Sequence, residues 1–233
     1  MSKQIYWEEF YRKIQRQEQK TPGGTYDWFF PYKVASPWLQ HYIEQQQTSL
    51  VQATNQKQQH TLLKAMDLGC GTSDLSALLY ADHPTLQITC VDFSKEAITK
   101  MQRMFGHLAP PKDNDPGITF VQGDAMQLPF KDQTFDICYE KGTVDAILKQ
   151  KTHGTSEAVK AICEISRVLK SSGVLLQFSD EPPELRLPVL ERAKGELVTL
   201  QNKSFSISFK DIGDFSGIEF FLYVMQDSKS VGL

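Results

Sequence analysis

From residue 62 onward, short apolar runs alternate with segments whose apolar residues recur at helical spacing. The runs predict strands at Leu63–Leu68, Ile88–Phe93, Ile118–Val121, Phe135–Tyr139, Val174–Phe178, Leu197–Leu200 and Ile218–Met225. Helical stripes between them are formed by Leu75, Leu78 and Leu79, by Ala97, Ile98 and Met101, and by Val159, Ile162, Cys163, Ile165 and Leu169. Such alternation indicates an α/β fold with a parallel sheet covered on both faces. The last two runs have no helical pattern between them, so we expect an antiparallel hairpin at one edge.

The first 61 residues follow a different pattern, rich in aromatic side chains. Residues 5–18 predict a helix carrying Trp7, Phe10 and Tyr11 near helical spacing, and Thr21–Gly24 should end it. An aromatic cluster at Tyr26–Phe30 precedes a second helix, expected at about Pro37–Gln47, and a glutamine-rich stretch. We expect residues 1–61 to form a lid segment packed on a core of residues 62–233, together making a single domain.

Composition narrows the class of protein. A chain of 233 residues with 40% hydrophobic content is large enough for one compact core. The net charge of −3 offers no basic field for nucleic acid, and no apolar run approaches the ~20 residues of a membrane span. The five histidines show no metal-ligand spacing. We therefore expect a monomer without a metal site that binds neither nucleic acid nor membrane.

The cysteines and the N-terminus bear on the compartment. Cys70, Cys90, Cys138 and Cys163 form no C-x-x-C pair, which predicts reduced, buried thiols in a reducing environment. Residues 1–20 mix basic residues with Glu8, Glu9 and Glu18, whereas a transit peptide is poor in acids and rich in serine. We expect a cytosolic chain, or one from which a targeting segment is missing.

A glycine loop follows the first predicted strand, in the run Asp67-Leu68-Gly69-Cys70-Gly71. A strand that enters a helix through such a loop is typical of a nucleotide-like binding site. The third glycine of the dinucleotide motif is replaced by Asp74, whose charge would repel a pyrophosphate. A ligand without phosphates is therefore favoured over a nicotinamide cofactor.

Two further carboxylates end successive strands. Asp92 lies 21 residues after Gly71, a spacing that suits hydrogen bonds from both ribose hydroxyls, and Phe93 follows it. Asp124 ends the third strand, where it can accept the exocyclic amine of an adenine while Ala125 leaves room for the ring. Either Asp alone fits a helix cap or a solvated turn as well, but in this order they indicate an adenosyl site.

These residues resemble the cofactor site of the class I S-adenosylmethionine (SAM)-dependent methyltransferases over roughly residues 62–226. The resemblance implies a Rossmann-like seven-stranded sheet in the order 3-2-1-4-5-7-6, with the seventh strand antiparallel. It also implies SAM as the cofactor, with Asp67, Gly69 and Gly71 in the loop, Asp92 at the ribose and Asp124 at the adenine.

The block Glu140-Lys141-Gly142-Thr143-Val144-Asp145-Ala146, together with Tyr26–Phe29, resembles protein-lysine methyltransferases that include elongation factor enzymes. The segments Gln177–Glu181 and Gly217–Phe221 resemble more closely the mitochondrial family that methylates citrate synthase. The resemblance implies a protein-lysine N-methyltransferase of the mitochondrial matrix with citrate synthase as its partner. A different protein acceptor such as an elongation factor, a small-molecule methyltransferase and a non-catalytic cofactor-binding module stay open.

Several residues receive expected roles on this basis. Glu140 or Asp145 is expected to orient the substrate lysine, and Lys141 to contact the cofactor carboxylate or the strand-end backbone; a Glu140–Lys141 surface pair and a helix-start Asp145 form the structural alternative. By resemblance, an aromatic lid contacts the cofactor, although the same rings would suit a core: Trp7, Tyr11 and Trp28. The acidic turn after the fifth strand is expected to meet a basic partner or to be merely solvated: Ser179, Asp180 and Glu181.

Overall fold

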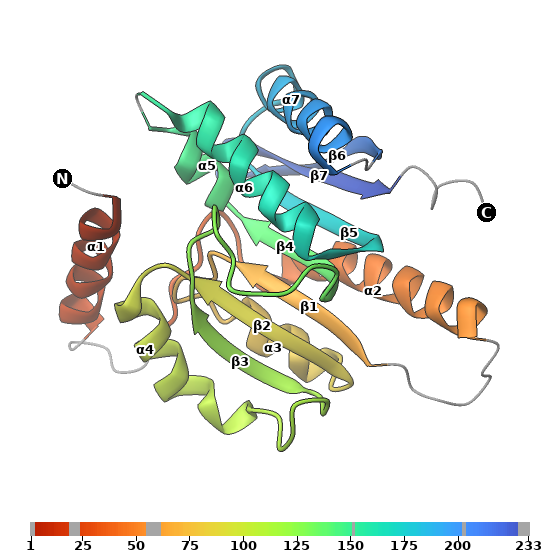
Figure 1. Ribbon diagram of the computed structural model, residues 1–233. Coiled ribbons are helices and arrows are strands. Elements are labelled where there is room, and N and C mark those ends of the chain that lie inside the picture. Colours follow the sequence, from red (N-terminus) through yellow and green to blue (C-terminus); the bar gives the residue numbers. More distant parts are fainter. Residues whose placement is uncertain (1–2, 19–23, 55–61, 151, 202–203, 228–233) are drawn as a thin grey trace.

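The computed structural model describes residues 3–18, 24–54, 62–150, 152–201 and 204–227 (Figure 1). Its helices are α1 (Lys3–Glu18), α2 (Tyr32–Thr54), α3 (Leu75–Asp82), α4 (Lys95–Phe105), α5 (Thr143–Leu148), α6 (Gly154–Val168) and α7 (Pro183–Gln201), with a 3-10 turn η1 at Gly106–Leu108. Its strands are β1 (Leu63–Leu68), β2 (Leu86–Asp92), β3 (Gly117–Gln122), β4 (Phe135–Lys141), β5 (Leu169–Ser179), β6 (Phe205–Phe215) and β7 (Ile218–Asp227).

The strands form one seven-stranded sheet in the order β3-β2-β1-β4-β5-β7-β6. The pairs among β1 to β5 are parallel, and β7 runs antiparallel to both β5 and β6. The predicted α/β fold and strand order are therefore confirmed. Because β1 lies between β2 and β4, the strand order reverses there, which is where ligands bind in open α/β sheets.

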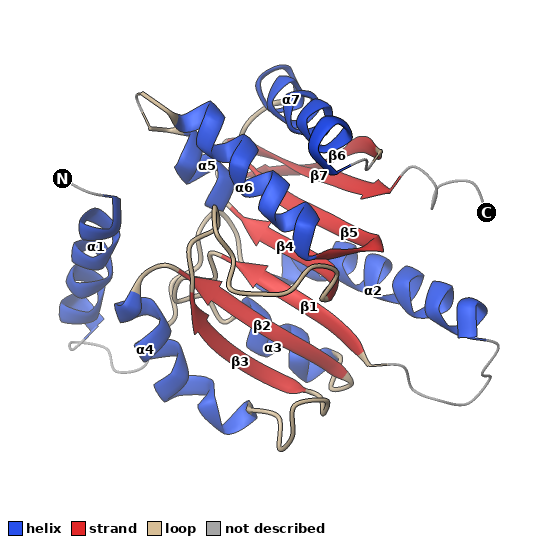
Figure 2. Ribbon diagram, viewed as in Figure 1, coloured by secondary structure: helices blue, strands red, loops and turns tan. Residues whose placement is uncertain are grey.

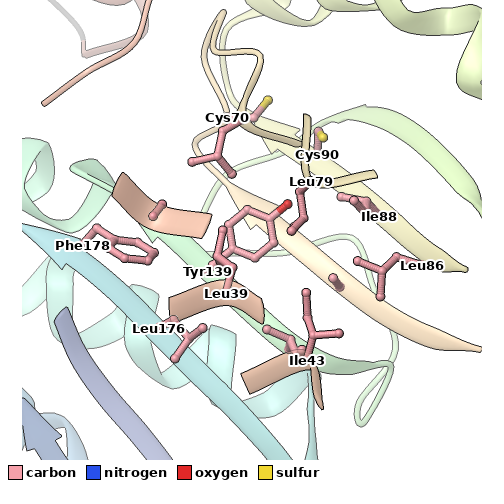
Figure 3. Packing of buried hydrophobic residues seen from close by; sticks show 14 of the residues in the cluster. Leu39, Ile43, Cys70, Leu79, Leu86, Ile88, Cys90, Tyr139, Leu176 and Phe178 are labelled. Carbon is pink, nitrogen blue, oxygen red and sulfur yellow. The ribbon is translucent and has the colours of Figure 1, made fainter. Parts of the chain in front are cut away.

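The strands alternate between two hydrophobic clusters, one on each face of the sheet. In β5, Val174 and Leu176 belong to one cluster while Leu175 belongs to the other, as the two-residue period of a strand requires. Helices α2, α3 and α4 contribute to the first cluster, and α5, α6 and α7 to the second (Figure 2). Figure 3 shows the ring of Tyr139 from β4 packed among Leu39, Leu79 and Leu176. The Tyr139 side chain is therefore part of the hydrophobic core near the carboxyl end of β4.

One predicted strand was wrong. Leu197–Leu200 lies inside α7, where Leu197 is buried and Val198 is half-exposed, as expected for one face of a helix. The sixth strand is instead Phe205–Phe215, whose middle residues are exposed. Because this edge strand is buried on one side only, its sequence contains no continuous apolar run. The predicted edge hairpin is confirmed, with its first strand displaced along the chain.

The second helix is longer than predicted and contains Pro37 in its interior. Proline removes one helical hydrogen bond, and the hydroxyl of Ser36 donates to the carbonyl of Lys33, the acceptor left open. Leu39 and Ile43 of this helix are buried against the sheet, so the helix belongs to the core packing. The expected break at Thr21–Gly24 and the end of the glutamine-rich stretch fall mostly outside the described residues. The division at residue 61 stays a prediction.

Three smaller expectations can be compared with the structure. Cys70, Cys90 and Cys138 are free and buried, but Cys163 is free and only half-buried, packed at the border of the second hydrophobic cluster. In the stripe of α3, Leu75 and Leu79 are buried while Leu78 is 41% exposed. Within the described residues, no helix is long and apolar enough to span a membrane.

Candidate active site

A cavity of about 490 Å³ opens at the carboxyl ends of β1, β2 and β4. The arrowheads of these strands point toward α1 (Figure 2). Its walls come from the glycine loop, the ends of β2 and β3, the end of β4 with α5, and aromatic side chains of the N-terminal segment. Every residue predicted to bind the cofactor lines it: Trp7, Tyr11, Trp28, Asp67, Gly69, Gly71, Asp92, Phe93, Asp124, Ala125 and Lys141.

The glycine loop is fastened to the end of β2. The amides of Gly69 and Cys70 donate to the carbonyl of Val91 at 2.7 and 3.1 Å. The amide of Gly71 donates to one carboxylate oxygen of Asp92 at 2.9 Å, and the amide of Ser94 donates to the other at 2.8 Å. Burial raises the pKa of Asp92 to about 6. The loop thus holds this carboxylate in a fixed orientation at the cavity wall.

The adenine end of the predicted site is built by the turn after β3. One oxygen of Asp124 accepts a hydrogen bond from the amide of Met126 at 2.9 Å, and the carbonyl of Asp124 accepts one from Gln127. These bonds turn the chain so that Asp124, Ala125 and Met126 all line the cavity. Phe93 from the end of β2 lines it as well.

Asp67 forms part of the cavity floor. Its carboxylate accepts a hydrogen bond from Ser76 at 2.6 Å, and the Ser76 hydroxyl lies 2.7 Å from that of Tyr139. Burial raises the pKa of Asp67 to about 7. The sequence did not point to Tyr139 or Ser76, because a buried strand residue and a helix serine are ordinary core positions.

An aromatic wall closes the cavity on the side of the N-terminus. Trp28 lies against Trp7, Phe10 and Tyr26 with ring centroids 5.8–6.0 Å apart. Helix α1 is held on α4 by Glu8, whose carboxylate accepts from the amide of Lys95 at 2.9 Å. Phe10 and Tyr26 were not predicted as site residues, although both stand in the aromatic segments that the sequence singled out.

Two glycines allow these aromatic rings to approach the loops. Gly71 has φ of +53°, and a Cβ there would lie 2.6 Å from the hydroxyl of Tyr11. Gly142 has φ of +82°, and a Cβ there would lie 2.7 Å from Cδ1 of Trp28. Only glycine suits both the left-handed backbone and the close contact. Phe29, next to Trp28, also has a positive φ of 69°, a costly conformation for an aromatic residue.

Lys141 and Asp27 join three segments at the cavity. The ammonium of Lys141 donates to Asp27 at 2.9 Å and to the carbonyl of Phe30 at 2.8 Å. The same oxygen of Asp27 accepts a hydrogen bond from the hydroxyl of Ser73 in the glycine loop. Burial lowers the pKa of Lys141, and the charge of Asp27 opposes that shift. The backbone contact of Lys141 is with the segment before α2, not with a strand end as one alternative had it. Asp27 lies in the segment Tyr26–Phe29, and the sequence alone assigned it no individual role.

Glu140 and Asp145 lie outside the cavity. Glu140 is fully buried, and one of its oxygens accepts hydrogen bonds from the amides of Thr143 and Val144 at 2.7 and 3.3 Å, so it caps α5. Burial, with the charge of Asp145, raises the pKa of Glu140 to about 8. Successive strand residues point to opposite faces, so Glu140 points away from Lys141. Glu140 is therefore not placed to contact an acceptor lysine in the cavity, and it does not form an exposed pair with Lys141.

Asp145 belongs to a buried cluster around Arg186. The Arg186 guanidinium lies 2.9 Å from Asp145 and 3.1 Å from Glu181, and the Ser179 hydroxyl donates to Asp145 at 2.5 Å. Burial raises the pKa of Asp145 to about 6. The predicted substrate residues Ser179, Asp180 and Glu181 therefore surround this cluster and do not line the cavity. The sequence did not single out Arg186 as a site residue, because its role depends on the packing of α7 against β5 and α5.

The residues present fit a SAM molecule. Thr72 lines the cavity with a buried hydroxyl that has no hydrogen-bond partner among the described residues, so it can serve the amino-acid end. Asp92 and Asp124 line the cavity, where the predicted contacts with ribose and adenine can form, and the aromatic wall can face a sulfonium.

Comparisons with known proteins agree with this arrangement. A family model described as a methyltransferase domain matches residues 59–205. The chain is 31% identical over 212 residues to the mitochondrial citrate synthase-lysine N-methyltransferase of Pongo abelii, covering 88% of this chain and 79% of that protein. It is 30% identical over 175 residues to the eEF1A lysine and N-terminal methyltransferase of Mus musculus, covering 75% of this chain and 21% of that longer protein.

The fold has a counterpart among solved structures. Magnesium protoporphyrin IX methyltransferase from Synechocystis PCC 6803, with bound SAM, superposes with a TM-score of 0.57 at 16% identity, covering 97% of this chain and 98% of that one. The sheet order, the glycine loop beside Asp92 and the family match lead to one conclusion. The chain belongs to the class I S-adenosylmethionine-dependent methyltransferases.

Proposed function

We propose that the protein is a protein-lysine N-methyltransferase, with citrate synthase as its acceptor. The observation that carries the proposal is the 31% identity to citrate synthase-lysine methyltransferases over most of both chains. The elongation factor relatives, which match a smaller share of their own length, carry a lysine activity in their name as well. A lysine side chain is therefore the acceptor that both groups of relatives have in common.

The cavity suits a lysine acceptor. SAM supplies an electrophilic methyl group, so the protein has to align a neutral nucleophile with it. A lysine with a pKa of about 10.4 is almost fully charged near neutral pH and must lose its proton. Trp28 and its aromatic neighbours present an apolar wall, next to which the neutral amine is favoured over the ammonium.

The proposed roles follow from position. Asp92 and Asp124 hold the adenosyl group, the glycine loop with Asp67 holds the amino-acid end, and Lys141 adds a positive charge near it. We assign Glu140 and Asp145 to positioning, because they fix α5 while Thr143, Ala146 and Ile147 of the same helix line the cavity. The citrate synthase-lysine methyltransferases among the relatives are named as mitochondrial. We propose the same compartment for this protein, with the cytoplasm as the alternative.

Labelled SAM incubated with the protein in separate mitochondrial and cytosolic extracts tests the proposal. We expect label in one protein band that co-migrates with citrate synthase and is lost with the Asp92→Asn variant. Label only on eEF1A in the cytosolic extract would leave a lysine methyltransferase with another acceptor. Label only in free metabolites would identify a small-molecule methyltransferase and contradict the proposal.

A further inference from the structure

Two neighbouring segments at the carboxyl edge of the sheet carry only acidic charges. Residues 180–185 contain Asp180, Glu181 and Glu184, residues 213–219 contain Asp214 and Glu219, and neither segment contains lysine or arginine. The two segments are adjacent because the end of β5 pairs with the first half of β7. In addition, the hydroxyl of Tyr223 in β7 donates to the carbonyl of Glu181 at 2.7 Å. We call these five carboxylates the acidic rim.

The charges of the rim are incompletely neutralised. Asp214 and Glu219 are exposed and face each other directly across the β6–β7 ladder, where like charges are unfavourable. Across the described ranges of the chain, neither of them nor Glu184 forms an ion pair. Among the residues that the structure describes, Asp180 forms an ion pair only with Lys149, at 3.6 Å, and the Lys149 side chain is 60% exposed. A cation that arrives from solvent would relieve this repulsion.

A buried carboxylate beneath the rim points to the same kind of ligand. Asp145 is 1% exposed, and its Oδ2 has no hydrogen-bond donor among the described residues. The Oδ1 atom of Asp180 also lacks a donor, and the two carboxyl groups contact each other, which raises the pKa of Asp145. The Arg186 guanidinium serves Asp145 and Glu181, while its Nη1 has no acceptor among the described residues. Because two carboxylates in contact disfavour each other's charge, an ammonium or guanidinium at the outer side of Asp180, whose side chain is 26% exposed, would be stabilised.

An organic cation fits this cluster better than a metal ion. Among the residues that the structure describes, no three His, Cys, Asp or Glu side chains are arranged to hold a metal. Leu185 and Ile218 flank the rim and are 61% and 49% exposed. Such apolar side chains can cover the aliphatic stems of lysine or arginine, whose charged ends then reach the carboxylates.

The rim lies next to the cavity, on the far side of α5. Thr143, Ala146 and Ile147 of α5 line the cavity, while Asp145 of the same helix faces Arg186. The ends of β4 and β5 are joined by a 3.1 Å bond from the amide of Gly142 to the carbonyl of Phe178. With neighbouring strands ~4.8 Å apart, the rim carboxylates, which follow β5 or lie on β7 and β6, are roughly 5–14 Å from β4, which about four residues of extended chain would span.

We propose that the acidic rim binds a lysine or arginine of the acceptor protein that lies within about four residues of the methylated lysine. This inference rests on the proposed function and specifies the acceptor sequence that the enzyme selects.

A binding experiment tests the rim without turnover. A fluorescent hexalysine peptide is titrated at low ionic strength into the protein bound to S-adenosylhomocysteine (SAH). The wild type is compared with the variant Glu184→Gln/Asp214→Asn/Glu219→Gln. Asparagine keeps the oxygen that accepts from the amide of Gly217, so the turn is preserved. A control for the change in net charge is Asp113→Asn/Asp115→Asn, which removes two carboxylates at the opposite edge, before the start of β3.

We expect the triple variant to bind hexalysine about tenfold more weakly, with a shallower salt dependence, and the control to bind like wild type. Equal affinity for wild type and triple variant would overturn the inference. SAH affinity should be unchanged in all three, because the substituted residues lie outside the cavity.

Steady-state methylation of citrate synthase separates the two proposals. We expect the triple variant to raise KM for the acceptor about tenfold while kcat stays the same. Equal KM values would overturn the rim and leave the proposed function intact. Failure of the wild type to methylate any protein would overturn the proposed function itself.

Discussion

Substitution of Gly142 by alanine tests how the aromatic wall is held over the cavity. The alanine Cβ would lie 2.7 Å from Cδ1 of Trp28 and 3.1 Å from Cε2 of Phe29, at a backbone φ of +82°. The left-handed conformation alone costs a non-glycine residue about 1–2 kcal/mol. For a domain of this size we expect Tm to fall by about 2–8 °C.

The same substitution should weaken SAM binding, because Trp28 must move away from Gly142. Loss of a ring that faces a sulfonium corresponds to about 0.5–2 kcal/mol, or roughly a two- to thirtyfold rise in Kd. Calorimetric titration with SAM and thermal unfolding measure both effects. Gly195→Ala is the matched control: it lies in α7 with no atom within 4 Å of an added Cβ, and should stabilise by about 0.5–1 kcal/mol. Unchanged SAM affinity and Tm in Gly142→Ala would refute this account of the wall.

Three further substitutions probe the carboxylates. Asp92→Asn should raise Kd for S-adenosylhomocysteine about ten- to hundredfold. Wild-type binding should weaken below about pH 6, where Asp92 takes up a proton, and this part of the weakening should be absent in the variant, while the contribution of Asp67 near pH 7 remains. Parallel pH profiles of wild type and variant would contradict the role of Asp92. The raised pKa of Glu140, about 8 against about 4.3 for an unfolded chain, means that the native state holds this proton more tightly, so stability should fall as pH rises from about 5 to 8. In Glu140→Gln, the free energy of unfolding in urea should change less between pH 6 and pH 8 than in the wild type, by up to about 3 kcal/mol. An equal change in both proteins would contradict the raised pKa of Glu140. Asp27→Asn should weaken SAM binding about tenfold by releasing Lys141, whereas wild-type affinity would mean that the Asp27–Lys141 contact does not organise the cavity.

Most of the fold could be predicted from the sequence because most strands are buried on both faces. Such strands produce continuous apolar runs, which identified six of the seven strands of the sheet. The sixth strand failed for the opposite reason. β6 lies at the edge of the sheet and contains exposed polar residues such as Lys210, so it has no continuous apolar run. The apolar run at 197–200 belongs instead to α7.

The candidate site was predictable where backbone position decides the role. Asp67, Asp92 and Asp124 end adjacent parallel strands, so topology alone places them at one cavity. The roles of Glu140 and Asp145 were not predictable in this way, because they depend on which side of β4 and α5 each side chain faces. Their partners Thr143 and Arg186 become visible only once the strands are paired and α7 is packed.

The most direct test of the proposed activity uses purified components. The protein is incubated with SAM and purified citrate synthase, and the acceptor is then examined by intact and fragment mass spectrometry. The account predicts whole methyl increments on a lysine side chain of citrate synthase, absent with Asp92→Asn. Unmodified citrate synthase, under conditions in which the same preparation methylates eEF1A or a small molecule, would contradict it.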